Sequence, residues 1–273
     1  MNYNLNLLKK PLPFQPGTLT LWSNDYIGKN VLKRHLDGSV DSGTRKTETL
    51  IKTANWLSHI NPDAASVLDV GCGPGLYAPL LCKDGMHYEG FDISPYQIAY
   101  ARQHNSVPGR IRFYRSDFRT WNSGQRYDLV LLLYGIYSFY CRNDRVAFLK
   151  KLKKNLSSSG GIVIEVFTPF HYESRSDTAD WEYIEQNGFW CKSPYLELNA
   201  FHKYEESLVL IQAAVLNDHL ELWNSWIQTF NTSSLLEELE EVGFTKVQLF
   251  GSCYGMPLTS QSEVLCVYAQ LQE

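Results

Sequence analysis

Length, composition and charge exclude several classes of protein at the outset. The chain has 273 residues, 44% hydrophobic and 20% charged, so it can bury a substantial core and is not disordered as a whole. Its formal net charge of −4 provides no basic field for binding a nucleic-acid backbone. The first ten residues lack the apolar run of a signal peptide, and the most apolar segment, 127–141, is too short to span a bilayer. We therefore expect a soluble cytoplasmic protein without nucleic-acid or membrane partners.

The cysteines do not follow the spacing of a metal ribbon or a disulfide framework. None of the six forms a C-x-x-C pair; they are Cys72, Cys82, Cys141, Cys191, Cys253 and Cys266. We expect them to be reduced, and we expect no metal site.

Between residues 45 and 169, short apolar runs alternate with segments of helical period. Five runs have the length of strands: 66–71, 88–91, 110–115, 128–133 and 161–167. Ser94 followed by Pro95 predicts a helix start, and Asn143 is expected to cap the next helix. This alternation predicts an α/β fold with a doubly wound, mostly parallel sheet.

The segment 170–230 differs from the rest of the chain in charge and pattern. It holds ten acidic and three basic residues. The runs 207–216 and 219–227 are rich in strand-forming residues and flank Asn217 and Asp218, a typical hairpin turn. We expect a small α+β insertion here.

Helix and strand signals return after the acidic segment. Ser234 and Glu237 have the spacing of a capping box, and Gly243 is expected to end the helix that follows. Two last strands are predicted near 244–250 and 263–270.

These patterns divide the chain into three parts. Residues 1–44 are expected to form an N-terminal cap. Residues 45–169 and 231–273 form the core, and 170–230 are an inserted lid that binds the acceptor.

The segment 67–75, Val-Leu-Asp-Val-Gly-Cys-Gly-Pro-Gly, carries the most specific signal. An apolar strand ends in an acid and enters a turn with Gly71, Gly73 and Gly75, where the absence of Cβ atoms lets the backbone approach a ligand. Open α/β sheets bind ligands at this end of their strands. A dinucleotide site would have glycine or alanine at Leu76, which disfavours a nicotinamide-dependent oxidoreductase.

Two further acids follow the next two strands. Asp92 ends the second strand, where a carboxylate can accept hydrogen bonds from both ribose hydroxyls. Asp117 follows the third strand and can accept from an adenine amino group while Phe118 packs on the ring.

Together the glycine turn and the three acids resemble the class I S-adenosylmethionine-dependent methyltransferases, a Rossmann-like family with a seven-stranded sheet. The resemblance covers 45–169 and 232–273 and implies an antiparallel last strand and S-adenosylmethionine as cofactor. It places Asp69 and the glycines beside the methionine part of the cofactor, Asp92 beside the ribose, and Asp117 with Phe118 beside the adenine. The residues that it implies for cofactor binding are Tyr26, Arg45, Asp69, Gly71, Cys72, Gly73, Gly75, Asp92, Ile93, Asp117, Phe118 and Leu133.

The run from Trp22 to Arg45 resembles the helical cap of small-molecule methyltransferases. Arg45 is expected either to pair with the cofactor's carboxylate or to form a surface ion pair. The insertion is rich in aromatic residues, which either line an acceptor pocket or form its core: Trp181, Phe189, Trp190, Tyr195, Phe201, Trp223 and Trp226.

Methyl transfer needs alignment of acceptor, methyl group and sulfur, and it needs a base only if the acceptor must lose a proton. His171 directly follows the fifth strand and is the best candidate for that base. Three other histidines compete for this role: His35, His202 and His219. Tyr134 and Tyr137, just past the fourth strand, either orient the acceptor or face the core.

The acceptor class follows from missing motifs and from charge. The fourth strand is not followed by the D/N-P-P-Y/F motif of amino-methylating DNA enzymes, and no Pro-Cys pair is present. We expect methyl transfer to an N, O or C atom of a small metabolite, by a monomer or homodimer. The acidic insertion favours a cationic acceptor. Two alternatives remain: a protein methyltransferase, and a cofactor-binding protein without catalysis on the same fold.

Overall fold

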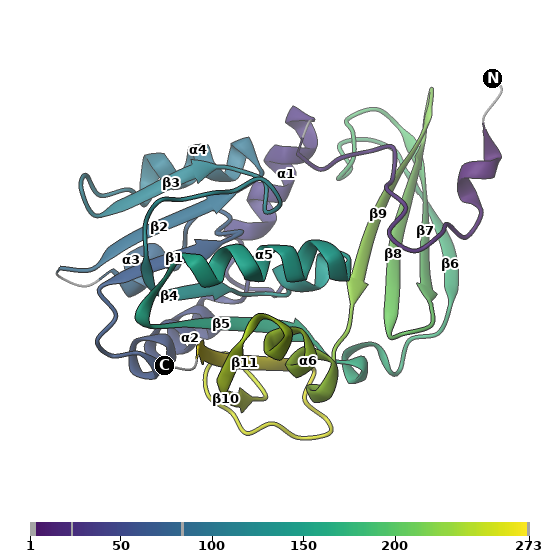
Figure 1. Cartoon of the computed structure of the whole chain (residues 1–273). Coiled ribbons are helices and arrows are strands. Elements are labelled where there is room, and N and C mark those ends of the chain that lie inside the picture. The colour runs from purple at the N-terminus through teal and green to yellow at the C-terminus, as the bar shows by residue number, and fades with distance from the viewer. Residues whose placement is uncertain (1–3, 23, 83–84, 272–273) are drawn as a thin grey trace.

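Two β-sheets, a large one and a small one, organise the molecule. The computed structural model describes residues 4–22, 24–82 and 85–271. In Figure 1 the large sheet lies to the left with helices on both faces, and the small sheet stands to the right.

The large sheet has seven strands in the order β10-β11-β5-β4-β1-β2-β3. Their bounds are β1 Ser66–Val70, β2 His87–Asp92, β3 Ile111–Arg115, β4 Tyr127–Leu132, β5 Leu156–Phe167, β10 Phe244–Phe250 and β11 Val264–Leu271. Strand β11 runs antiparallel to both neighbours, whereas β3, β2, β1, β4 and β5 pair in parallel. The expected doubly wound sheet with an antiparallel last strand is confirmed.

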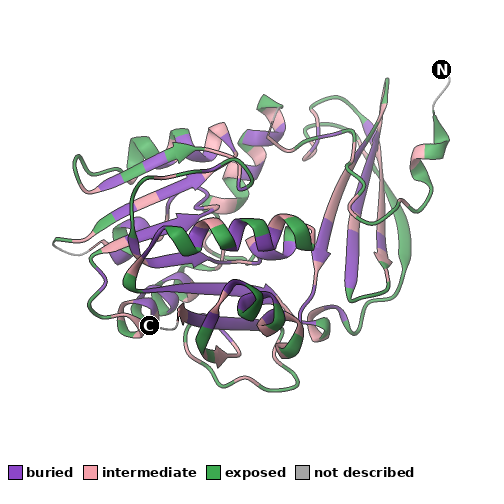
Figure 2. Ribbon diagram, in the orientation of Figure 1, coloured by how far each residue is buried: buried purple, intermediate pink, exposed green. Residues whose placement is uncertain are grey.

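Two hydrophobic clusters fill the two sides of this sheet (Figure 2). The helices are α1 Asp25–Leu36, α2 Thr47–Ile60, α3 Ala78–Leu81, α4 Pro95–His104, α5 Arg142–Lys154 and α6 Thr232–Val242. Helices α5 and α6 contribute to the cluster on one face, and α2, α3 and α4 to the cluster on the other. No helix in the described ranges has the length and apolar character needed to cross a membrane.

The predicted helices are present, but two of the three predicted N-terminal caps differ from the observed ones. Ser94 accepts a hydrogen bond from the Gln97 N–H at the start of α4, as expected. The N-cap of α5 is Cys141, not Asn143. The cap of α6 is Asn231, whose side chain accepts from the Ser234 N–H, so that helix begins earlier than the predicted capping box.

The small sheet is the insertion. It is antiparallel in the order β6-β7-β8-β9, with bounds β6 Thr178–Ile184, β7 Tyr195–Lys203, β8 Leu208–Leu216 and β9 Leu220–Gln228. The predicted hairpin turn between β8 and β9 is confirmed. Strand β8 is an almost continuous apolar run that is buried along most of its length, and it pairs with β9 over its whole length. Apart from the 3-10 turn η3, Pro169–Tyr172, the described insertion contains no helix, so the expected helical part of the insertion is absent from the described residues.

The N-terminal part of the chain packs against this small sheet. The Leu19 N–H donates to the Leu222 carbonyl at 2.8 Å, and the Trp226 indole donates to the Gln15 carbonyl at 2.8 Å. In Figure 1 this segment, in purple, runs along β9 and β8. Helix α1 therefore reaches the large sheet from the side of the insertion.

Candidate functional site

The glycine turn between β1 and α3 is held in left-handed backbone geometry. Gly71, Gly73 and Gly75 have φ of 69°, 54° and 73°, values that residues with a Cβ rarely adopt. A Cβ on Gly75 would lie 2.5 Å from the Phe113 ring, so this glycine is also required by packing. The turn at the carboxyl end of β1 therefore needs glycine for its backbone conformation and, at Gly75, also for the space beside it.

Asp92, at the end of β2, is bonded to this turn. Its Oδ2 accepts from the Gly73 N–H at 3.1 Å, and its Oδ1 accepts from the Ser94 N–H at 2.7 Å. Burial raises the pKa of Asp92 to about 6, although these N–H groups favour the carboxylate. Each oxygen keeps a further lone pair, which is the acceptor pattern that two vicinal hydroxyls need.

Asp69, predicted to border the methionine part, is deeply buried beneath the turn. The Tyr88 hydroxyl donates to its Oδ2. Burial raises the pKa of Asp69 to about 7, and the charge of Asp92 adds to this rise. This bond holds the carboxyl group inside the protein, next to the end of β1.

The end of α1 covers the glycine turn from above. A Cβ built on Gly73 would lie 3.3 Å from Nδ1 of His35, which also lies 2.8 Å from the Thr44 hydroxyl. Burial lowers the pKa of His35 to about 4, so this imidazole is neutral at physiological pH. Tyr26, at the other end of α1, donates to the Gly188 carbonyl of the insertion at 2.8 Å.

Tyr134 and Arg45 meet at the carboxyl ends of β4 and β5. Tyr134 has φ of 54°, and its N–H donates to Oε2 of Glu165 at 2.6 Å. Nη2 of Arg45 lies 2.5 Å from Oε1 of the same carboxylate, and its guanidinium lies 4.6 Å from the centre of the Tyr134 ring. Arg45 therefore forms a half-buried ion pair inside the protein rather than at its surface.

His171 lies close to this cluster, in η3. Its ring is 31% exposed, and Nδ1 lies 3.5 Å from Oε2 of Glu263. Burial lowers the pKa of His171, Glu263 partly opposes that effect, and the charge of Arg45 lowers the pKa further. The structure thus brings together Arg45, Tyr134 and His171, three of the predicted site residues.

Tyr137 and Phe118, two of the predicted site residues, are both buried. Tyr137 is fully buried, and its hydroxyl donates to Oε2 of Glu238 at 2.5 Å, so it faces the core and does not touch an acceptor. Phe118 is 3% exposed and packs between Tyr140 and Phe148, with ring centroids 4.1 and 3.7 Å away. Both faces of its ring are covered by these neighbours in the described structure, and its contact with an adenine stays a prediction.

The other residues predicted to bind the cofactor are buried or already have a partner within the protein. Asp117 is paired with Arg119, whose Nε and Nη2 lie 3.0 and 2.9 Å from its oxygens and lower its pKa. Cys72 and Leu133 belong to the buried cluster on the α2 face, so they can offer a ligand only backbone atoms. The Ile93 carbonyl accepts from Arg115 at 3.3 Å. None of these placements tests cofactor binding by itself.

Glu165 and Gln97 are missed in the sequence analysis. Glu165 is the single acid in an apolar strand, a signal that marks a buried carboxylate with a partner. Gln97, in the first turn of α4, is 1% exposed, and neither its amide oxygen nor its amide nitrogen has a hydrogen-bond partner among the described residues. An orphaned buried amide near Asp92 fits a site that a bound polar molecule completes.

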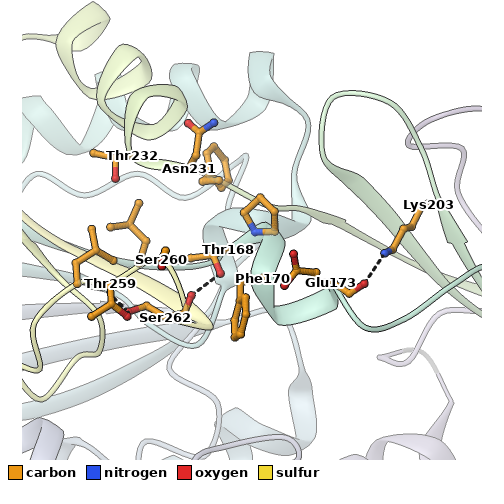
Figure 3. Close-up of a pocket in the computed structure, with 13 residues that line it drawn as sticks. Thr168, Phe170, Glu173, Lys203, Asn231, Thr232, Thr259, Ser260 and Ser262 are labelled. Carbon is orange, nitrogen blue, oxygen red and sulfur yellow. Dashed lines mark hydrogen bonds between the residues drawn. The ribbon is translucent and has the colours of Figure 1, made fainter.

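A hollow of about 550 Å³ adjoins the end of β5 (Figure 3). Its lining combines hydroxyl, amide and charged groups with an aromatic ring, as in Thr168, Phe170, Lys203, Asn231, Thr259 and Ser262. It lies beside η3, the turn that carries His171.

The chemistry of these groups fits S-adenosylmethionine. Asp92 offers acceptors for ribose hydroxyls. Gly71 and Gly73 carry no Cβ atoms, and the side chains of Ile136 and His35 lie next to them. Gln97 supplies a buried amide still to be hydrogen-bonded. Fold and site together define the class of S-adenosylmethionine-dependent methyltransferases.

Comparison with known proteins agrees with this class. The chain belongs to the methyltransferase domain family, whose model matches residues 44–249. It is 27% identical over 106 residues to the dTDP-3-amino-3,6-dideoxy-alpha-D-glucopyranose N,N-dimethyltransferase of Streptomyces fradiae, covering 38% of this chain and 40% of that enzyme. The curated relatives that it matches are covered over only 28 to 56% of their own lengths.

Two of the solved structures that the chain resembles illustrate the similarity of fold. The CcbJ methyltransferase of Streptomyces caelestis is 14% identical with a TM-score of 0.66, covering 91% of this chain and 100% of that one. CalS10, an amino pentose methyltransferase from Micromonospora echinaspora solved with S-adenosylmethionine bound, is 19% identical with a TM-score of 0.57, covering 88% and 96%. At such identities these structures establish the fold alone.

The raised pKa of Asp92 predicts how cofactor affinity depends on pH. Protonation removes acceptor capacity, so affinity should be greatest above pH 6 and fall as the pH drops through that value. Without ligand, a rise in pH has the opposite effect on the folding stability that Asp92 contributes. The folded state holds this proton more tightly than the unfolded chain does, so the contribution of Asp92 to stability declines as pH rises from about 4 to about 6. Calorimetric titration of S-adenosylhomocysteine between pH 5 and 8 measures the first effect.

The variant Asp92→Asn separates this carboxylate from the other titrating groups. It cannot titrate, so its weaker binding should lose the step near pH 6. A step of the same size in the variant would assign it to Asp69 or His171 instead.

Proposed function

We propose that this protein transfers the methyl group of S-adenosylmethionine to an amino nitrogen of a small hydroxylated molecule in the cytoplasm. The observation that carries the methyl-transfer proposal is the hydrogen bond from the Gly73 N–H to Asp92. This bond joins the glycine turn to a carboxylate that can accept hydrogen bonds from ribose hydroxyls. The nitrogen acceptor is supported by the Streptomyces fradiae relative and by CalS10, both named as methyltransferases of amino sugars.

The chain's own part is to align the acceptor, exclude water and accept a proton. Bound S-adenosylmethionine supplies an electrophilic methyl group with a neutral thioether as leaving group. A protonated amine must lose a proton before its lone pair can attack. His171, neutral at pH 7 because burial lowers its pKa, can accept that proton while Glu263 stabilises the imidazolium.

The hollow beside η3 suits the part of the acceptor that does not react. Its hydroxyl and amide groups can hydrogen-bond to a polyol, and the Phe170 ring offers an apolar contact for the face of a sugar. Its charged lining residues include both a lysine, Lys203, and an acid, Glu173. The lining therefore favours a hydroxylated molecule over a strongly charged one.

The direct test combines cofactor titration with a panel of acceptors. Purified protein is titrated with S-adenosylmethionine and S-adenosylhomocysteine and is then supplied with methyl-labelled cofactor and amino sugars, free and nucleotide-linked. Matched sugars with hydroxyl in place of the amine serve as controls. Labelling of the amines alone supports the proposal. Cofactor binding without labelling of any acceptor would favour a binding protein, and labelling of hydroxyl sugars alone would overturn the amine assignment.

His171→Ala should lower kcat about 100-fold at pH 7 and leave cofactor affinity unchanged, because only the proton acceptor is removed. Steady-state kinetics from pH 6 to 9 measure the effect, and the loss should shrink at high pH, where the free amine exists without a base. Tyr137→Phe is the control, since that hydroxyl is buried against Glu238. A similar fall in kcat in both variants would show a structural effect.

A further inference from the structure

The segment 37–46 between α1 and α2, here called the strap, crosses the carboxyl end of the large sheet. Most of its residues are exposed, and the helices α1 and α2 anchor its two ends. Its Ser42 carbonyl accepts from the Tyr134 hydroxyl at 3.0 Å, and its Arg45 pairs with Glu165 at 2.5 Å. Tyr134 and Glu165, at the ends of β4 and β5, therefore hold the strap in place.

Glu165 joins both groups. One oxygen binds Arg45 of the strap, and the other accepts from the Tyr134 N–H. Tyr134 has a left-handed backbone, which costs energy for a residue with a Cβ and persists only when its surroundings hold it. Because the side chain of Glu165 is 6% exposed, both contacts form in a poorly solvated environment where they are strong.

The strap in turn fixes the cover of the glycine turn. Thr44 of the strap contacts the His35 ring at 2.8 Å, and that ring lies over Gly73, whose N–H binds Asp92. A continuous chain of contacts thus runs from Glu165 through the strap to the residues that fit the cofactor.

We propose that Glu165 is a positioning residue that holds the strap closed over the cofactor, and that release of its contacts with Arg45 and Tyr134 opens the path by which the cofactor enters and leaves. This inference rests on the proposed function for the identity of the ligand. The contacts of Glu165 exist in the protein without ligand, so its role in holding the strap can be tested separately.

The test compares E165Q with a control variant of the same chemistry. Glu238 also pairs a buried carboxylate with an arginine and a tyrosine, Arg145 and Tyr137, but it joins α5 to α6 away from the strap. Hydrogen exchange of the strap amides is measured without ligand in native protein, E165Q and E238Q. We expect exchange in the strap to accelerate about tenfold in E165Q and to remain native in E238Q.

A second readout uses the ligand. Stopped-flow fluorescence gives the dissociation rate of S-adenosylhomocysteine, which should rise about tenfold in E165Q and less in Y134F, a variant that keeps the ion pair and loses only the bond to Ser42. If the hydrogen exchange of the strap amides is unchanged in E165Q, or increases equally in E238Q, Glu165 does not hold the strap closed. If native protein binds no S-adenosylhomocysteine, the proposed function fails, while the exchange experiment still decides whether Glu165 holds the strap.

Discussion

Asp92→Ala is expected to weaken binding of S-adenosylmethionine about a thousandfold. If Asp92 holds the ribose as proposed, the variant removes two charge-assisted hydrogen bonds to it, each worth about 1.5–3 kcal/mol. It also leaves the Gly73 and Ser94 N–H groups without their acceptor, so the glycine turn loses its support. Calorimetric titration of native and variant protein measures the loss directly.

Asp128→Ala is the matched control for this experiment. Asp128 also accepts from two backbone N–H groups, those of Ala65 and Ser66, both at 3.0 Å, but it does so near the start of β1. Its removal should lower the unfolding midpoint and leave cofactor affinity native. If both variants bind equally weakly, the loss reflects damage to the sheet; if Asp92→Ala binds normally, the ribose lies elsewhere.

Arg145→Met is expected to lower the free energy of unfolding by about 3–5 kcal/mol. The guanidinium, 3% exposed, makes two hydrogen bonds to Glu238, at 3.0 and 2.5 Å. Without it, the buried carboxylate keeps only the Tyr137 hydroxyl as a side-chain partner in the described structure. Urea denaturation gives the difference in free energy.

Two further variants show whether burial causes this effect. Arg142→Met breaks an exposed pair between the same two helices, Arg142 with Glu241, and should leave the urea midpoint nearly native. The double variant R145M/E238L removes both buried charges and should recover most of the lost stability. A double variant as unstable as R145M would mean that shape, rather than charge, dominates at this position.

The sequence predicts the central strands of the large sheet well because β1, β4 and β5 contain strong apolar runs. The run 128–133 differs from the observed β4 by one residue at each end, and 161–167 ends where β5 ends. The carboxyl ends of parallel strands meet at one edge, so the positions of Asp69 and Asp92 also follow from the sequence.

Side-chain direction after a strand does not follow from the sequence in the same way. Tyr134 and Tyr137 stand three residues apart, yet Tyr134 faces the strap and Tyr137 the core. The left-handed backbone at Tyr134 and Gly135 redirects the chain there, and no periodicity predicts that turn. The role of Glu165 cannot be predicted from the sequence either, because its partner Arg45 lies 120 residues earlier in the chain.

The contact between the N-terminal segment and β9 has a consequence for synthesis on the ribosome. Gln15 and Leu19 bond to Trp226 and Leu222, about two hundred residues later in the chain. The segment is made about two hundred residues before its partners on β9, so they can cover it only late in synthesis. Its exposed leucines, Leu5, Leu8 and Leu12, remain near the surface even in the folded protein. During translation, therefore, this segment stays uncovered until β9 has been made, and a chaperone that binds nascent apolar segments can bind it in that interval.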